Sequence, residues 1–125
     1  MVPITVLVVD DEEVVRAVTS RMLAHLGATA RMAATGEEAL RTLGHDGAGV
    51  DVVLLDLGLP GCSGDEVLAE LQRRRVPVRV LVASGYADAT TAAAALANGA
   101  AGFVAKPYSV QSLGEALRAA MAAPT

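Results

Sequence analysis

The stretch Val52-Val53-Leu54-Leu55-Asp56, followed by Leu57-Gly58-Leu59-Pro60-Gly61, decides how this chain folds. A short apolar run bounded by turn residues is typical of a buried strand in a parallel sheet. The run ends at a carboxylate, and a charge at the end of a buried strand needs a partner. A second apolar run, Ile4–Val9, ends in the same way, at Asp10 and Asp11.

If the two runs are neighbouring parallel strands, the carboxylates of Asp10, Asp11 and Asp56 meet at one edge of the sheet. Such a cluster repels itself unless a cation neutralises it. The arrangement therefore predicts a divalent metal ion and a chemistry that uses one. Taken alone, Asp10 or Asp11 is better interpreted as an N-cap of the helix that follows.

Strand-like and helical patterns alternate along the whole chain. The strand-like runs are Ile4–Val9, Ala28–Ala33, Val52–Leu55, Val78–Ala83 and Gly102–Ala105. Three helical patterns cover about 12–26, 88 to about 98, and 109 to about 122. Two more begin at capping boxes, one at Thr35 and one at Ser63. Five such units imply a parallel sheet with helices on both faces and right-handed crossovers.

The first helical pattern carries Val15, Val18, Met22 and Leu26 on one face, which we expect to be its apolar side. Glycines at 27, 44 and 99 fall where helices should stop.

Composition describes an ordinary globular domain, and we expect residues 1–125 to form one. The 53% of hydrophobic residues and the mean hydropathy of +0.44 argue against disorder. No apolar run approaches the roughly 20 residues that span a bilayer, and the start lacks the basic region of a signal peptide, so we expect a cytoplasmic protein. The single cysteine, Cys62, excludes an internal disulfide, and the net charge of −4 argues against direct contact with nucleic acid.

Four short motifs stand at the ends of four strand-like runs. They are Val8-Val9-Asp10-Asp11-Glu12, Leu55-Asp56-Leu57-Gly58-Leu59-Pro60-Gly61, Ala83-Ser84-Gly85 and Phe103-Val104-Ala105-Lys106-Pro107. Each alone is weak, but in this order and spacing they resemble the receiver domain of bacterial two-component response regulators, from Val6 to about Met121. The stretches Ser84-Gly85-Tyr86-Ala87 and Lys106-Pro107-Tyr108-Ser109 look most like receivers attached to hybrid sensor histidine kinases.

The resemblance implies a flavodoxin-like (CheY-like) α/β fold, a doubly wound five-stranded parallel sheet of order 2-1-3-4-5 with five helices. A chemotaxis regulator of this family is itself a standard illustration of that order, so the order comes with the resemblance. The ligand crevice then lies at the carboxyl ends of the first and third strands, where Asp10, Asp11 and Asp56 stand. Ser84 and Lys106 come to the same rim.

By the same resemblance, Asp56 accepts a phosphoryl group from a phosphohistidine of a histidine kinase or a histidine phosphotransfer protein. Mg²⁺, or Mn²⁺, would remove the repulsion between the carboxylate and the phosphoryl group, and it prefers oxygen ligands. Asp11, Asp56 and the backbone carbonyl of Gly58 would be ligands, and Asp10 would position the ion through water.

The resemblance also assigns the remaining rim residues. Lys106 would pair with a phosphoryl oxygen and Ser84 would donate a hydrogen bond to another. The Lys106–Pro107 bond would be cis and aim the lysine inward. Ser84 and Phe103 would form a switch that changes the surface made by the fourth helix, the fifth strand and the fifth helix.

We also expect the chain to catalyse only its own phosphorylation and dephosphorylation. It would be a monomer or a weak phosphorylation-dependent dimer, with no direct membrane contact. In the family, side chains at the positions of Gly58 and Tyr86 tune phosphoryl lifetime. The chain ends soon after its last helix, which leaves no room for a DNA-binding output domain.

Three other classes compete with this assignment. A haloacid-dehalogenase-type phosphatase wants a second aspartate two residues after the nucleophile, where this chain has Gly58. A flavin or nucleotide binder wants a Gly/Ser/Thr-rich loop after the first strand, where this chain has acidic residues at 10–13. A degenerate receiver that only binds partners is disfavoured because no phosphorylation residue is missing.

Overall fold

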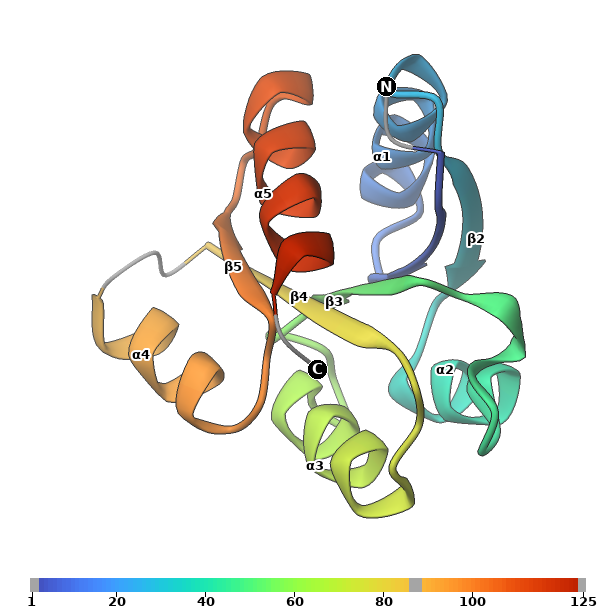
Figure 1. Ribbon diagram of the computed structural model, residues 1–125, viewed down its shortest axis with the longest axis vertical. Coiled ribbons are helices and arrows are strands. Elements are labelled where there is room, and N and C mark those ends of the chain that lie inside the picture. Colours follow the sequence, from blue (N-terminus) through green and yellow to red (C-terminus); the bar gives the residue numbers. More distant parts are fainter. Residues whose placement is uncertain (1–2, 86–88, 124–125) are drawn as a thin grey trace.

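Strands and helices alternate in the computed structural model, which describes residues 3–85 and 89–123. Their order is β1 (Thr5–Val9), α1 (Glu13–His25), β2 (Thr29–Ala33), α2 (Gly36–Leu43), a short 3₁₀ helix (Gly47–Gly49), β3 (Val52–Asp56), α3 (Gly64–Arg74), β4 (Arg79–Ser84), α4 (Ala89–Ala97), β5 (Gly102–Ala105) and α5 (Val110–Ala122). The strands form one parallel sheet in the order β2-β1-β3-β4-β5 (Figure 1). This is the predicted flavodoxin-like fold.

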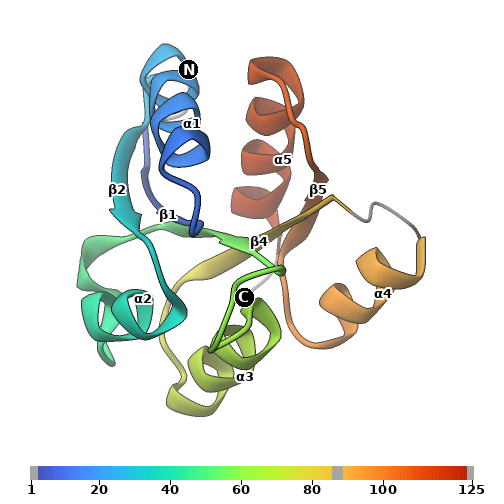
Figure 2. The same ribbon diagram turned by 180° about the vertical axis from the view of Figure 1, so that it is seen from behind.

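The helices lie in two layers, with α1 and α5 on one face of the sheet and α2, α3 and α4 on the other (Figures 1 and 2). Successive side chains of a strand point to opposite faces, so each central strand contributes to two cores. Leu7 and Val9 of β1 pack in the core that contains Leu68 of α3, whereas Val6 and Val8 pack in the core that contains Leu113 of α5. Both faces are covered, which is why the central strands are apolar without interruption.

The two predicted capping hydroxyls start their helices. Thr35 Oγ1 accepts a hydrogen bond of 3.0 Å from the Glu38 N–H, and Ser63 Oγ accepts one of 3.2 Å from the Glu66 N–H. These bonds satisfy amides that the first helical turn leaves without a partner. The predicted glycine stop at Gly99 is also confirmed, because it has a φ of +97° just after Asn98, the residue that follows α4.

Strand register brings the predicted rim residues to one level. Val9 pairs with Leu55, so Asp10 and Asp56 follow side by side at the carboxyl edge. Asp56 pairs with Ala83, and Ser84 pairs with Ala105, the residue before Lys106. The parallel strands thus bring five residues from distant parts of the sequence to one edge of the sheet: Asp10, Asp11, Asp56, Ser84 and Lys106.

The apolar stripe predicted for α1 is only half buried. Val18 is 45% exposed, and the fully buried positions of this helix are Thr19 and Leu23. The buried stripe is therefore shifted by one residue from the apolar stripe, and a polar residue occupies it. In the described part of the chain, no helix has the length and apolar character needed to cross a membrane.

Candidate functional site

Three carboxylates meet at the carboxyl edge of the sheet. Asp10, Asp11 and Asp56 each offer an oxygen within 4.8 Å of the others. Asp10 and Asp56 are buried and Asp11 is exposed, so the cluster opens to solvent on one side. Hard oxygen ligands at this spacing suit a divalent cation such as Mg²⁺, which the mutual repulsion of the carboxylates also favours. The cluster could therefore hold a metal ion.

Local hydrogen bonds orient the two buried carboxylates. Asp56 Oδ1 accepts a bond of 3.0 Å from the Gly58 N–H, and Asp10 Oδ1 accepts one of 2.9 Å from the Glu12 N–H. The N-cap residue of α1 is Glu12, and its own side chain accepts no capping hydrogen bond, so neither Asp10 nor Asp11 occupies the N-cap position. The alternative function of Asp10 or Asp11 as the helix cap is therefore wrong.

Lys106, directly after the end of β5, reaches two of the carboxylates. Its Nζ lies 2.7 Å from Asp10 Oδ2 and 3.5 Å from Asp56 Oδ2. Burial lowers the pKa of Lys106, but the hydrogen bond to Asp10 and the charge of Asp56 outweigh burial and leave this pKa above its ordinary value. The lysine is therefore a cation held against both carboxylates.

The backbone around Lys106 is also tied to the rim. The Lys106 N–H donates a bond of 2.9 Å to the carbonyl of Ser84, and the Lys106–Pro107 peptide bond is cis, as we expected. Ser84 itself is buried at the end of β4. Phe103 is half-buried and packs against the core on the α2–α3 side of the sheet. Tyr86 lies outside the described residues.

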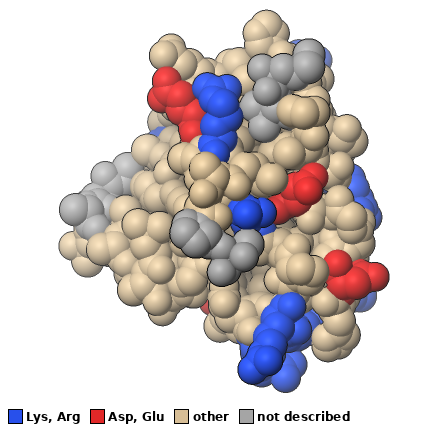
Figure 3. Space-filling model, viewed as in Figure 1, with Lys and Arg blue, Asp and Glu red and all other residues tan. Residues whose placement is uncertain are grey.

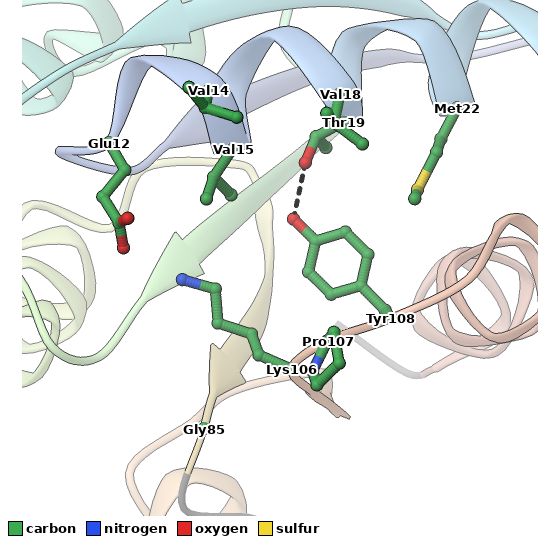
Figure 4. A pocket seen from close by; sticks show the side chains of 10 residues that line it. All are labelled: Glu12, Val14, Val15, Val18, Thr19, Met22, Gly85, Lys106, Pro107 and Tyr108. Atoms are coloured by element: carbon green, nitrogen blue, oxygen red, sulfur yellow. Dashed lines mark hydrogen bonds between the residues drawn. The ribbon is translucent and has the colours of Figure 1, made fainter.

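A groove opens beside the lysine, between α1 and the segment that joins β5 to α5 (Figure 4). It has a volume of about 460 Å³ and is mostly apolar. Its lining residues are Glu12, Val14, Val15, Val18, Thr19, Met22, Gly85, Lys106, Pro107 and Tyr108. The sequence did not reveal the pair that bridges this groove, Thr19 and Tyr108, although a threonine spaced four residues from both Val15 and Leu23 was a visible signal.

Comparisons with known proteins match the chain to one family. Residues 6–118 match the response regulator receiver domain. The chain is 37% identical over 109 residues to the sensor kinase CckA of Brucella abortus, covering 87% of this chain and 12% of that protein. It is 37% identical over 116 residues to the transcriptional regulatory protein TcrA of Mycobacterium tuberculosis, covering 93% of this chain and 45% of that protein. The chain thus spans less than half the length of these relatives.

Solved structures agree with this match. A response regulator receiver domain protein from Clostridium thermocellum has a TM-score of 0.85 at 28% identity, with 94% of each chain covered. The chemotaxis protein CheY4 of Vibrio cholerae has a TM-score of 0.83 at 26% identity, covering 92% of this chain and 96% of that one. With its sheet order and four rim motifs in place, the chain belongs to the response regulator receiver domain family of two-component signalling.

Proposed function

We propose that the chain, over residues 1–125, is a phosphoacceptor domain in which Asp56 accepts a phosphoryl group from a phosphohistidine. The donor would be a histidine kinase or a histidine phosphotransfer protein. The observation that carries the proposal is the meeting of three carboxylates with one lysine, whose Nζ lies 3.5 Å from Asp56 Oδ2. These groups are the ones that phosphoryl transfer to a carboxylate requires.

The carboxylate of Asp56 is held in one orientation for this reaction. Its Oδ1 accepts the Gly58 N–H, and its Oδ2 faces the Lys106 ammonium. In the transfer, a carboxylate oxygen of Asp56 forms a bond to phosphorus while the bond from phosphorus to the histidine nitrogen breaks. Lys106 would neutralise a phosphoryl oxygen, and the Ser84 hydroxyl would donate a hydrogen bond to another.

A divalent cation, Mg²⁺ or Mn²⁺, would offset the repulsion between the carboxylate and the phosphoryl group. We propose Asp11, Asp56 and the Gly58 carbonyl as its direct ligands, with Asp10 acting through water. The donor set fits this ion, because all its members are hard oxygen atoms and the carboxylates converge within 4.8 Å.

Phosphorylation would change the conformation of the output surface formed by α4, β5 and α5. Ser84 would move toward the phosphoryl group, and Phe103 would fill the space that it leaves. The surface over α4 is uncharged in Figure 3, which agrees with its sequence of alanine, threonine and leucine. A partner would therefore contact the α4 part of this surface mainly through uncharged side chains.

The remaining parts of the proposal follow from the family and from the net charge of −4. The chain would act in the cytoplasm, would catalyse only its own phosphorylation and dephosphorylation, and would contact neither nucleic acid nor membrane directly. It would be a monomer or a weak phosphorylation-dependent dimer.

Intact-mass measurement after incubation with acetyl phosphate tests the proposal. The wild type should gain one phosphoryl group, and only with a divalent cation present. Asp56→Asn should gain none, because an amide cannot replace the nucleophilic carboxylate. Asp65→Asn, at an exposed position in the first turn of α3, is the matched control and should be labelled like the wild type. Equal labelling of wild type and Asp56→Asn would overturn the assignment.

A further inference from the structure

One hydrogen bond connects α1 to the segment that carries the lysine. Thr19 Oγ1 of α1 lies 2.7 Å from the hydroxyl of Tyr108, and Figure 4 shows the bond crossing between the helix and this segment. Thr19 is fully buried, and the ring of Tyr108 packs against the core on the α1–α5 side of the sheet. Both hydroxyls are thus shielded from most solvent. A shielded hydroxyl without a hydrogen-bond partner costs free energy.

Thr19 is a polar residue at a buried position of α1 that an apolar side chain could also fill. Its neighbour on the buried side of α1 is the fully buried Leu23, so an aliphatic residue at 19 would continue an apolar face. The chain instead places there a hydroxyl that has a partner 89 residues away. Burial raises the pKa of Tyr108 and the Thr19 hydrogen bond lowers it, with a net rise above the ordinary value, so the phenol stays protonated near neutral pH.

Lys106 lies between two anchors of the same short segment. On one side, its own N–H donates to the Ser84 carbonyl at 2.9 Å. On the other side, two residues further on, Tyr108 is held by Thr19. Between α1 and the segment lies the open groove of about 460 Å³, so this side of the segment borders open space as well as the core.

We propose that Thr19 and Tyr108 are positioning residues, which through their mutual hydrogen bond hold Lys106 in reach of a phosphoryl group on Asp56. This inference rests on the proposed function for its kinetic consequence. A lysine side chain has four rotatable bonds, and its ammonium acts as a point charge on a flexible stem. Fixing the backbone at both sides of Lys106 limits where that charge can lie, and small displacements of a reacting group slow a reaction.

The kinetic test compares phosphorylation by acetyl phosphate at saturating Mg²⁺. Tyr108→Phe and Thr19→Val each remove one partner of the bond, and each should slow labelling of Asp56 by about threefold to tenfold. The double variant should be no slower than either single variant, because all three lose the same bond.

Thr19→Ser separates positioning from mere packing. It keeps the hydroxyl but loses a buried methyl group, so its melting temperature should fall while its labelling rate stays near that of the wild type. Thr35→Ala is the matched control, because it also loses a threonine hydroxyl bond, the 3.0 Å bond to Glu38, at a helix start unconnected to Lys106. Its rate should equal the wild-type rate. Labelling of Tyr108→Phe and Thr19→Val at the wild-type rate would overturn the proposal.

A second measurement does not depend on phosphorylation. Lys106 is the only lysine in the sequence, so protein labelled with ¹³C-lysine gives one ε-methylene NMR signal that needs no assignment. Its two protons should be inequivalent in the wild type, in Thr19→Ser and in Thr35→Ala, where the ammonium is held at Asp10. They should move toward equivalence in Tyr108→Phe and Thr19→Val.

The two measurements also separate the two hypotheses. A wild type that takes no phosphoryl group would contradict the proposed function, and the lysine signal would still decide whether Thr19 and Tyr108 position Lys106. An unchanged lysine signal in Tyr108→Phe would overturn the positioning role, whatever the labelling of the wild type.

Discussion

Lys106 lies among three carboxylates, and the charges do not balance. Against the negative charges of Asp10, Asp11 and Asp56 stands one ammonium, which is 2.7 Å from Asp10 and 3.5 Å from Asp56. Three carboxylates and one ammonium leave two formal negative charges, which a divalent cation would neutralise. Because Lys106 is closer to Asp10, it would have to turn toward Asp56 when a phosphoryl group arrives there.

Magnesium should therefore stabilise the fold, and Asp11 should be needed for the effect. Ligand that binds only the native state raises its stability, by about 1.4 kcal/mol at ten times the dissociation constant. Asp11→Ala should abolish the Mg²⁺-induced rise in melting temperature, and because Asp11 is exposed the change leaves no cavity in the core. Thermal melts with and without Mg²⁺ measure this. The control Asp65→Ala should keep the Mg²⁺-induced rise in melting temperature. If Asp11→Ala also keeps this rise, the ion binds elsewhere.

Gly58 should influence the lifetime of the phosphoryl group. Among the described residues, a Cβ at this position would meet only Asp56 Oδ1, at the ordinary contact distance of 3.5 Å. An asparagine amide there could orient an attacking water, and Gly58→Asn should therefore lose the phosphoryl group severalfold faster than the wild type. Decay followed by intact mass measures the rate, with Gly58→Ala as the control that adds no amide. Similar decay in the wild type and Gly58→Asn would count against this role. The companion prediction, that Tyr86 shields the phosphorus, concerns a residue outside the described ones.

Among the helices, α4 is anchored by small side chains. It consists of alanine, threonine and one leucine, and that leucine, Leu96, is 51% exposed. Among the α4 side chains that the structure describes, the buried one is Ala95, whereas α3 buries Val67, Leu68 and Leu71. Burial free energy scales with the apolar area removed from water, so α4 gains less from packing than α3.

Helix α4 should therefore exchange its amides faster than α3, and its exchange should change most on activation. Beryllofluoride mimics the phosphoryl group, and its binding at Asp56 should alter protection in α4, β5 and α5. Hydrogen–deuterium exchange with and without beryllofluoride measures the change, and Asp56→Asn, which should not respond, is the control. Protection changes confined to α1 and α2 would rule out this output surface.

The two faces of the sheet carry separate cores, and Tyr108 is partly buried against the core beneath α1 and α5. Burial raises its pKa above the ordinary value of 10.0, although the hydrogen bond from Thr19 opposes the rise. A group whose folded pKa exceeds its unfolded pKa contributes stability that is complete below the unfolded value. That stability is lost as the pH rises through the folded value.

The free energy of unfolding should consequently fall above about pH 10, and Tyr108→Phe should show a smaller fall. The pKa of Lys106 is also raised, so deprotonation of Lys106 lowers the free energy of unfolding as well. This loss occurs in both the wild type and Tyr108→Phe. Urea unfolding from about pH 8 to about pH 11 compares the two slopes. Equal slopes would show that Tyr108 titrates alike in the folded and unfolded chains.

The sequence alone determined the strand-and-helix alternation, the parallel sheet and the edge at which the site lies. Apolar runs that end in Asp10 and Asp56 are sufficient for this, because parallel strands bring their carboxyl ends to one edge whatever the helices between them contain. The family motifs then added Ser84 and Lys106 to that edge. The helix starts at Thr35 and Ser63 were equally local, because a capping hydroxyl acts within three residues.

Tertiary packing decided the contacts between residues that are distant in the chain. No spacing rule indicates that Lys106 pairs more closely with Asp10 than with Asp56, since the choice depends on side-chain positions across 96 residues. The prediction of the buried side of α1 from its apolar stripe was wrong by one residue for a related reason. Periodicity counts Thr19 as polar and Val18 as apolar, but Tyr108 satisfies the buried hydroxyl of Thr19, while the groove leaves Val18 partly in solvent. A residue's partner and its exposure are set by the surface that packs against it, and that surface exists only once the chain has folded.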